Sequence, residues 1–466
     1  MKCLLTYLLI MTLAACVAED TNRFTGFWEG PHPVNPESKF YVELVCENDS
    51  FLGRAFWAEN RHYQSTFKID SVRIAGDSMC FFVPAWGCTY TGGLSDKGVI
   101  RGGFFCEGEA FDTVILVKDQ EIENHLIYSK PGCNDPDFSY AYVIPAEGDD
   151  LLEPSAYTTA GDSLFIHSLL PEIIQGEYGR INSFLLYRSD KLICEEYFYG
   201  FTRDDLHQIE SCTKSVTSLL VGIAVDQAYI TNLGEALYSI FPEYPVLGKA
   251  GYRDLNIEDL LTMKSGYDLL DKALFSLEHF IDTALVRPLS NPPGKVFQYD
   301  GANTEILGVV LKKKTGMFAD EFARKYLFEP LHIERYNWDG PGQNGYPLMC
   351  GSLSLTPRSM VKIGAMVLNH GRFNEQEVLS ESWIEESTSV KTETNFPGDK
   401  YSYQWWNLHL DSGGKAYKTI WANGWGSQFI FIIPELDAVI VTTGFNYEND
   451  SWAIREGISK YLHYLD

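Results

Sequence analysis

Basic residues are scarce in this sequence. Its 466 residues include 37 lysines and arginines against 63 aspartates and glutamates, which gives a formal net charge of −26. Such a charge repels the phosphates of nucleic acids and the headgroups of anionic lipids. The sequence therefore argues against nucleic acid as a partner. After the first 20 residues it also lacks any apolar run long enough to span a bilayer, so a membrane is expected only through an anchor.

Metal-binding patterns are missing as well. There is no Cys-x-x-Cys pair and no histidine-rich cluster, so a zinc mechanism has no support. Among the ten cysteines, Cys46, Cys80, Cys88 and Cys106 gather in the first part of the chain. Export would permit disulfide bonds among them, but spacing reveals neither their oxidation state nor their pairing.

Residues 1–20 have the pattern of a signal peptide. Lys2 precedes an apolar run over residues 4–13, and small residues follow. The segment Leu13-Ala14-Ala15-Cys16 resembles the lipobox of bacterial lipoproteins, which implies a lipidated Cys16 and a protein of the cell envelope, periplasmic or on the outer surface. The alternative is ordinary cleavage after Ala18, which would release a soluble exported protein.

The length and the apolar content of 45% favour two domains rather than one. Residues 21–130 consist of short segments rich in β-branched and aromatic residues, separated by turn signals, which predicts an all-β domain. Its Gly/aromatic rhythm resembles small lipocalin-like barrels or sandwiches, and we assign it no chemistry. Prolines and acidic residues mark residues 131–162 as a linker. Helical and strand patterns resume at residue 163 and continue to residue 466, with a predicted helix over 164–176.

The remaining chain is organised around residues 209–227. Apolar residues recur there at helical spacing, which predicts a helix with one buried face. Ser211 and Lys214 stand three residues apart at its start, on neighbouring positions of one face. The first turn also offers backbone N–H groups and the positive end of the helix dipole, both suited to holding negative charge. This pattern predicts a serine acylation site.

The local spacing is not unique. Ser359 and Lys362, and again Ser412 and Lys415, repeat it. Two glycines after Ser412 disfavour a helix start there, and Ser359 lies inside a helix with an ordinary apolar face. The other interpretation of Ser211 is a capping serine followed by a solvated lysine.

Two further elements bear on the chemistry. Tyr299 lies in a loop between prolines and an apolar helix, where a phenol can pass protons across a pocket, although an ordinary core tyrosine is the alternative. Near the C-terminus, glycines precede a hairpin whose strands are predicted over 428–433 and 438–443. An N–H at that strand edge would complete an oxyanion hole with the N–H of Ser211.

Taken in this order, the three elements resemble the serine β-lactamase and penicillin-recognising hydrolase family. The resemblance covers roughly residues 150–466 and is closest to the class C-like esterase and 6-aminohexanoate-oligomer hydrolase branch. It implies an α+β fold, a β-lactamase/DD-peptidase-like antiparallel sheet flanked by helices, preceded here by the small all-β domain. Ser211-Cys212-Thr213-Lys214 matches the S-x-x-K motif of the family.

The resemblance also implies roles for residues in the other two elements. Tyr299-Asp300-Gly301 falls where the family has Y-x-N, with Gly301 in place of the asparagine, and Asn303 follows it. Lys418-Thr419-Ile420 takes the place of K-T-G, again with a departure at its last residue. The implied catalytic residues are Ser211, Lys214 and Tyr299, and the implied oxyanion hole is formed by the backbone N–H groups of Ser211 and Trp421. The implied substrate-binding residues are Gly301, Asn303, Lys418, Thr419 and Trp421.

The implied mechanism is acyl transfer through Ser211 to water, without a metal or organic cofactor. Either Lys214 is the base, which requires its pKa to fall well below the ordinary value, or a Tyr299 phenolate stabilised by Lys214 is. A small-molecule or peptide-like ester or amide is the expected substrate, and Trp405, Trp406, Trp421 and Trp425 suggest an aromatic-lined cleft. A catalytically weak surface lipoprotein that binds peptide or glycan is the alternative, because Gly301 and Ile420 depart from the family pattern. The oligomeric state is left open.

Overall fold

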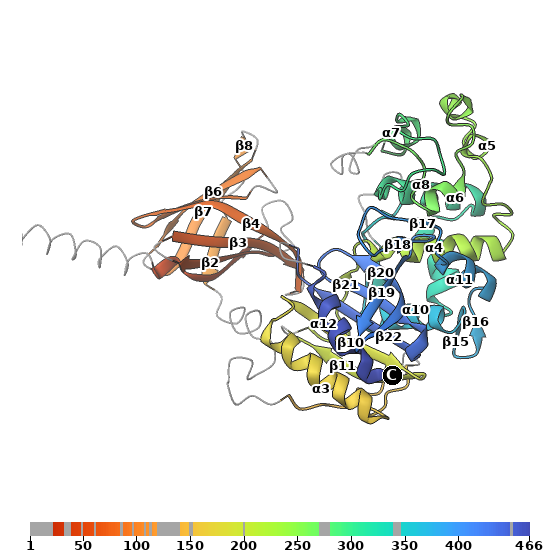
Figure 1. Cartoon of the computed structure of the whole chain (residues 1–466). Coiled ribbons are helices and arrows are strands. Elements are labelled where there is room, and N and C mark those ends of the chain that lie inside the picture. Colours follow the sequence, from red (N-terminus) through yellow and green to blue (C-terminus); the bar gives the residue numbers. More distant parts are fainter. Residues whose placement is uncertain are drawn as a thin grey trace, which may run out of the picture. The chain divides into compact units, whose positions relative to one another are not determined.

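The structure is a computed structural model, drawn in Figure 1. It describes residues 22–31, 39–47, 50–59, 62–83, 87–95, 97–106, 109–110, 114–118, 140–148, 152–198, 201–269, 280–338, 346–447 and 451–466. The predicted signal segment and Cys16 lie outside these residues. The chain divides into two compact units, residues 1–131 and 132–466, and each is described by itself.

The first unit is an antiparallel sheet in the order β6-β5-β4-β3-β2-β1-β9-β7-β8, and it follows the short helix η1 (Asn22–Phe24). The strands are β1 (Gly26–Pro31), β2 (Lys39–Glu47), β3 (Ser50–Glu59), β4 (His62–Ala75), β5 (Ser78–Val83), β6 (Cys88–Leu94), β7 (Val99–Cys106), β8 (Glu109–Ala110) and β9 (Val114–Lys118). Because β6 pairs with β7 as well as with β5, the sheet curls back on itself. The predicted all-β domain with a barrel-like sheet is therefore confirmed.

Glycine and tyrosine shape the interior of this unit. Gly92 of β6 lies opposite Gly102 of β7, and a Cβ added at Gly102 would come within 2.7 Å of the Tyr90 hydroxyl. The two glycines thus leave the space that the buried Tyr90 ring needs. Cys88 and Cys106 face each other across β6 and β7 and form a disulfide, while Cys80 is free. This pairing could not be read from the spacing of the cysteines.

The second unit is built on an eight-stranded antiparallel sheet in the order β11-β10-β22-β21-β20-β19-β18-β17. Its strands are β10 (Ile181–Arg188), β11 (Lys191–Tyr197), β17 (Thr392–Glu393), β18 (Lys400–Tyr401), β19 (Trp406–Ser412), β20 (Lys415–Gly424), β21 (Gln428–Ile433) and β22 (Ala438–Gly444). The hairpin of β21 and β22 turns through η7 (Pro434–Leu436) and agrees with the predicted strands. The α+β fold with an antiparallel sheet is confirmed.

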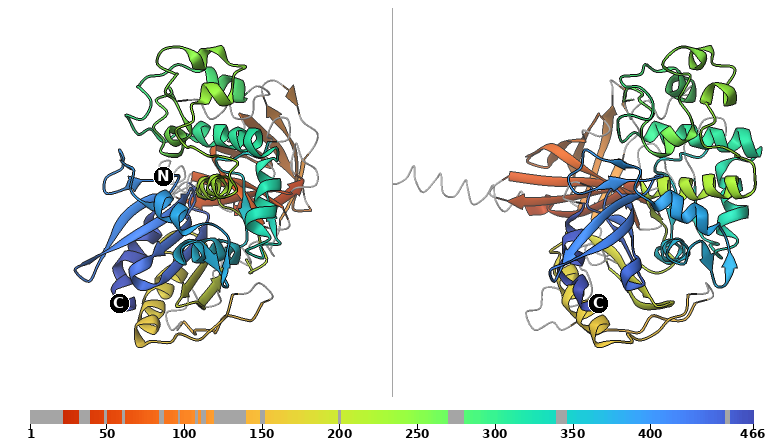
Figure 2. Two further views of the ribbon diagram at one scale, coloured as in Figure 1. Left: turned by 90° about the vertical axis from the view of Figure 1, so that its right-hand side faces the viewer. Right: turned by 45° about the vertical axis from the view of Figure 1, so that its right-hand side comes forward.

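Helices cover both faces of this sheet (Figures 1 and 2). On one face lie α3 (Ala160–Gln175), α12 (Ala453–Tyr461) and η8 (Leu462–Leu465), and on the other lie α4 (Cys212–Asp226) and α10 (Pro357–Leu368). Alternation along the strands divides the apolar side chains between the faces. In β20, Trp421 joins the cluster on the α3 side, whereas Ile420 and Ala422 join the cluster on the α4 side.

The α4 face continues into a group of helices beyond the sheet, visible at the top of Figure 1. These are α5 (Leu237–Ile240), η3 (Pro245–Gly248), α6 (Ile257–Leu261), α7 (Phe280–Val286), α8 (Gly301–Thr315), α9 (Ala319–Ala323) and η5 (Arg324–Phe328), and α11 (Glu381–Thr388) also packs on this side. Short strands complete the unit: β12 (His207–Gln208), β13 (Tyr336–Asn337) and β14 (Ser354–Leu355) form one sheet, and β15 (Arg372–Phe373) pairs with β16 (Gln376–Glu377). Helix α8 contacts α4, α6 and α7, which brings the Tyr299 and Ser211 regions together.

The segment expected to be a linker belongs in part to the second unit. The Tyr142 hydroxyl donates to the Ile193 carbonyl at 2.7 Å, and Pro154 pairs with Leu192 beside the sheet edge. The following helix begins at Ala160, four residues earlier than predicted, because Thr159 and Asp162 form a reciprocal capping box. No helix among the described residues is both long and apolar enough to cross a bilayer.

Candidate active site

Ser211 stands at the N-terminus of α4, partly exposed, directly after a strained residue. Glu210 has a φ of 50°, a left-handed conformation that non-glycine residues rarely adopt. This tight turn carries the chain from β12 into α4 and leaves Ser211 at the Ncap position. The Ser211 side chain makes no capping hydrogen bond. The interpretation of Ser211 as a capping serine therefore has no support in the geometry.

The Ser211 hydroxyl instead contacts Lys214. The Lys214 Nζ donates to Ser211 Oγ at 2.8 Å and to the Cys350 carbonyl oxygen at 2.6 Å. It also lies 5.2 Å from the centre of the Tyr299 ring. With only 4% of its surface exposed, the lysine is not a solvated surface residue. The structure thus brings together the three residues Ser211, Lys214 and Tyr299.

The charge environment of Lys214 favours the ammonium. Burial by itself would lower the pKa of Lys214, but Tyr299, Cys350 and Glu305 outweigh burial and raise that pKa above its ordinary value. A lysine whose pKa is raised is a poor proton acceptor near neutral pH. The fall in pKa that a base role for Lys214 requires is therefore not found.

Tyr299 is held by aromatic neighbours and by the start of α8. Its ring packs against those of Tyr401 and Trp406, with centroids 6.1 and 5.3 Å away. The next residue, Asp300, caps α8 by accepting from the Ala302 N–H at 3.0 Å. The other Asp300 oxygen lies 2.6 Å from Arg287 in an ion pair whose side chains are 3% and 4% exposed. Tyr299 is thus attached to a rigid helix start.

A buried carboxylate that the sequence analysis missed lies beside this group. Glu305 of α8 is 5% exposed and accepts from the N–H groups of Met349 at 3.1 Å and Cys350 at 2.8 Å. Burial raises the pKa of Glu305 to about 7, while the two N–H groups, the Cys350 side chain and Lys214 oppose the rise. An ionisable residue within the apolar run of α8, six positions after Tyr299, was the available signal in the sequence.

Gln404 is a second residue near the site that the sequence analysis did not identify. Its side-chain amide donates to the carbonyls of Leu260 and Leu261, and its side-chain oxygen accepts from Thr304 at 2.9 Å. Its backbone carbonyl accepts from Ser215 at 2.7 Å. Gln404 therefore joins α4, α6 and α8 around the site, from a left-handed conformation with φ of 61°.

The segment after β20 approaches Ser211 from the sheet side. A Cβ added at Gly424 would lie 2.3 Å from the Ile209 carbonyl oxygen, so only glycine permits this approach. The Cys212 thiol donates to the Gln428 carbonyl at 3.0 Å. Residues 424–428 therefore pass beside Ser211, with contacts to Ile209 before it and to Cys212 after it. Trp425 lies in the turn between these two contacts.

Trp421 is misplaced in the prediction. It is flanked in the sheet by Trp406 and Phe431, so its N–H belongs to the strand ladder. Its side chain is fully buried, stacked on Phe431 on the face away from α4. Trp421 can therefore neither complete an oxyanion hole nor touch a substrate. Trp405 and Trp406 are also buried, and Trp425, 56% exposed, is the one of the four predicted cleft tryptophans that reaches solvent.

The remaining predicted substrate contacts fall in different environments. Gly301 is partly exposed at the first position of α8. Asn303 is fully buried and points its amide at the Met263 sulfur, 3.5 Å away. Thr419 is fully buried and donates to the Tyr417 carbonyl, while Lys418 is exposed next to it in β20, opposite His409. Burial removes Asn303 and Thr419 from direct contact with a substrate.

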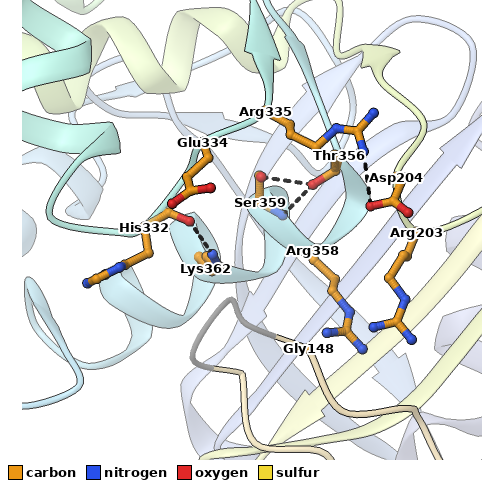
Figure 3. A pocket seen from close by; sticks show the side chains of 10 residues that line it. All are labelled: Gly148, Arg203, Asp204, His332, Glu334, Arg335, Thr356, Arg358, Ser359 and Lys362. Carbon is orange, nitrogen blue, oxygen red and sulfur yellow. Dashed lines mark hydrogen bonds and ion pairs between the residues drawn. The ribbon is translucent and has the colours of Figure 1, made fainter.

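The two other serine and lysine pairs make contacts with other residues. Ser359 bonds with Thr356 at 2.8 Å, whereas Lys362 donates to the His332 carbonyl at 2.6 Å. Both contacts are drawn as dashed lines in Figure 3. Ser359 and Lys362 line a polar cavity of about 220 Å³ with several charged side chains. In the third pair, Ser412 bonds with His463 and Lys415 with Asp466.

One group of metal-ligand type occurs among the described residues. His370, Glu381 and Glu385 bring their ligand atoms within 4.8 Å of one another, and all three are exposed. This group lies on the surface at α11, and surface carboxylates often cluster in this way without an ion. It contributes nothing to the site around Ser211.

Comparison with known proteins shows what the second unit is similar to. The family model described as Beta-lactamase matches residues 182–451, more than half of the chain. The chain is 25% identical over 285 residues to the 6-aminohexanoate-dimer hydrolase of Paenarthrobacter ureafaciens, which covers 56% of this chain and 71% of that enzyme.

Two solved structures show the same fold. A penicillin-binding protein homologue from Caulobacter crescentus gives a TM-score of 0.54 at 12% identity, over 67% of this chain and 99% of its own. EstCE1, a hydrolase with promiscuous acyltransferase activity, gives a TM-score of 0.50 at 14% identity, over 65% of this chain and 98% of its own.

Proposed function

Because this chain belongs to the beta-lactamase family and is a hydrolase on that ground, we propose that it cleaves an ester or amide bond through an acyl-enzyme on Ser211. The observation that carries the proposal is the 2.8 Å hydrogen bond from Lys214 to a serine hydroxyl that has no capping role. Nucleophile and partner lie within hydrogen-bond reach of each other, which is the geometry that nucleophilic catalysis requires.

Tyr299 is the proposed base. Lys214, whose pKa is raised, is poorly suited to accept a proton, and its Nζ lies 5.2 Å from the centre of the Tyr299 ring, so we assign the role of proton acceptor to the Tyr299 oxygen. The phenolate takes the Ser211 proton as the serine oxygen attacks the carbonyl carbon, and it returns that proton to the leaving alcohol or amine. A water then attacks the acyl-enzyme with the same assistance, and the acid product leaves.

The oxyanion hole is proposed to use the N–H groups of Ser211 and Trp425. Ser211 is at the N-terminus of α4, where the helix dipole favours negative charge. Trp425 follows Gly424, whose missing side chain lets the turn approach Ile209. In comparable sites one such donor contributes about 3 to 4 kcal/mol to the transition state.

An acyl group with apolar surface is the proposed substrate feature. Trp425 is exposed beside the nucleophile and packs edge-on against Tyr447, with ring centroids 4.9 Å apart. An exposed aromatic side chain in this position offers stacking area to a substrate. The curated relative is named for a 6-aminohexanoate dimer, so a linear amide belongs among the candidates beside small esters and β-lactams.

Export with a lipid anchor is proposed from the first 20 residues alone. Cys16, preceded by Leu13-Ala14-Ala15, would become the lipidated first residue of the mature protein, so the catalytic unit would work at the cell envelope. Metabolic labelling with a palmitate analogue and a Cys16→Ser variant tests this, because the variant should lose the label and enter the soluble fraction.

The catalytic proposal is tested on protein lacking residues 1–20. Hydrolysis of p-nitrophenyl acetate and butyrate, nitrocefin and the 6-aminohexanoate dimer is measured beside fluorophosphonate labelling located by mass spectrometry. Ser211→Ala should lose turnover and label, whereas the matched variant Ser359→Ala should keep both. Label on another residue, or equal activity in Ser211→Ala, would refute the proposal, and the ranking of the four substrates assigns the bond type.

A further inference from the structure

The environment of Lys214 depends on a segment far away in the sequence. The carbonyl that receives its 2.6 Å hydrogen bond belongs to Cys350, whose position must be fixed if Lys214 is to point at Ser211. Residues 349–350 lie in a turn outside any helix or strand, so no ladder of backbone hydrogen bonds holds them.

Glu305 supplies the missing attachment. Its two carboxylate oxygens accept the consecutive N–H groups of Met349 and Cys350, at 3.1 and 2.8 Å. A carboxylate that accepts two backbone N–H groups forms charge-assisted bonds, which are stronger than neutral ones. One turn further along α8, Gly308 leaves room for the Met349 side chain, because a Cβ there would lie 2.5 Å from Met349 Cγ. Helix α8 thus fixes the turn at two points.

We propose that Glu305 is a positioning residue of the catalytic group, which acts on Ser211 through the Cys350 peptide and Lys214. This inference rests on the proposed function and deepens it. The connection runs from the Glu305 carboxylate to the Cys350 N–H, from the Cys350 carbonyl to Lys214 Nζ, and from there to Ser211 Oγ. The same α8 carries Tyr299 at its entrance, so one helix sets the lysine and the tyrosine together.

Protonation of Glu305 would weaken this connection. A neutral carboxyl has an O–H donor in place of one acceptor, and that donor would face an N–H group. The titratable groups around Glu305 are Lys214 of α4 and the Cys350 thiol, with Glu210 and Tyr299 beyond them. Since burial raises the pKa of Glu305 to about 7, the change falls near neutral pH.

The stability of the protein separates this role from a merely structural one. Because the pKa of Glu305 is higher in the folded state, ionising this carboxyl lowers the stability of the protein. The loss grows as the pH rises from the ordinary pKa of 4.5 to about 7, and it is complete above that pH. At pH 8 the variant Glu305→Gln should therefore melt within a few degrees of the wild type. A residue kept for stability would instead show a clear loss.

The test uses Glu305→Gln in protein lacking residues 1–20, with Asp259→Asn as the matched control. Asp259 of α6 is also a buried carboxyl that accepts a backbone N–H, and burial raises its pKa to about 6. For p-nitrophenyl butyrate, Glu305→Gln should lower kcat about 10- to 100-fold, because a shifted Cys350 carbonyl leaves Lys214 and Ser211 misaligned, and change KM little. The rate of fluorophosphonate labelling should fall by the same factor.

The pH profile gives the decisive comparison. The wild-type labelling rate should fall on the acid side with a midpoint near 7, Asp259→Asn should keep this limb, and Glu305→Gln should lose it. A limb that persists unchanged in Glu305→Gln, or a kcat within about twofold of wild type, would overturn the inference. If Glu305→Gln does not fold, the wild type still tests the inference. A wild-type labelling rate that is flat between about pH 6 and 8 would overturn it. A wild type that is never labelled at Ser211 would instead refute the proposed function.

Discussion

Replacing Arg287 with methionine should release the helix start that carries Tyr299. The Arg287 guanidinium pairs with Asp300 at 2.6 Å, and both side chains are almost fully buried. Its plane also lies 4.5 Å from the centre of the Tyr267 ring. The contact with Asp300 is an ion pair without the alignment of a good hydrogen bond. Neither the guanidinium nitrogens of Arg287 nor the Oδ2 atom of Asp300 has a hydrogen-bond partner among the described residues.

The magnitude follows from the charge left behind. Removing one partner of a buried ion pair costs about 3 to 5 kcal/mol, because the other charge remains uncompensated in an apolar site. The double variant Arg287→Met with Asp300→Asn removes both charges, and asparagine caps a helix as well as aspartate does. The double variant should therefore regain most of the stability, to within about 1 to 2 kcal/mol of wild type.

The assay is urea unfolding of protein lacking residues 1–20, with loss of fluorophosphonate labelling at Ser211 as the signal for the second unit. Lys313→Met is the control, because its pair with Glu243 is half exposed and should contribute at most about 1 kcal/mol. The single variant should also lose about tenfold or more in kcat as Tyr299 becomes misplaced. A single variant as stable as Lys313→Met, or a double variant no better than the single, would refute this reasoning.

Three further outcomes are expected. Tyr299→Phe removes the proposed base and should lower kcat for p-nitrophenyl butyrate about 100-fold or more. The acylation burst is the readout, and an unchanged burst would contradict the assignment of Tyr299 as the base. Trp425→Ala should raise KM for p-nitrophenyl butyrate about 5- to 30-fold with little change in the melting temperature, because the Trp425 ring is exposed. Trp421→Ala should instead lower the stability of the second unit by about 3 to 5 kcal/mol, because the Trp421 ring lies in the hydrophobic core. Gln404→Leu leaves the Thr304 hydroxyl without its acceptor and removes one of the two donors to each of the Leu260 and Leu261 carbonyls. It should cost about 1 to 3 kcal/mol in urea unfolding, and a smaller cost would show that α4, α6 and α8 do not need these bonds.

Sequence reasoning succeeded where the information is local. Ser211 and Lys214 meet because residues three apart in a helix are neighbours, whatever surrounds them. The hairpin of β21 and β22 was likewise readable from a short stretch. A resemblance carried by three such elements in order led to the right fold and family.

Sequence reasoning failed where two segments far apart in the chain pack against each other. Motif order alone placed Trp421 at the oxyanion hole, but the position of β20 between β19 and β21 buries it and brings residues 424–428 to Ser211 instead. The direction of the Lys214 pKa shift was equally beyond reach, because it depends on Tyr299, Cys350 and Glu305 together.

The sequence by itself indicated a β-rich segment before an α+β one and placed Ser211 beside Lys214, because helical and strand periodicity are fixed within a few turns of chain. Only the tertiary structure decided which glycine lies against Ile209, which cysteines pair and which carboxylate accepts the N–H of Cys350. Each of these is a contact across many residues, between Gly424 and Ile209, Cys88 and Cys106, and Glu305 and Cys350. Such contacts arise from the packing of whole elements, which no single segment encodes.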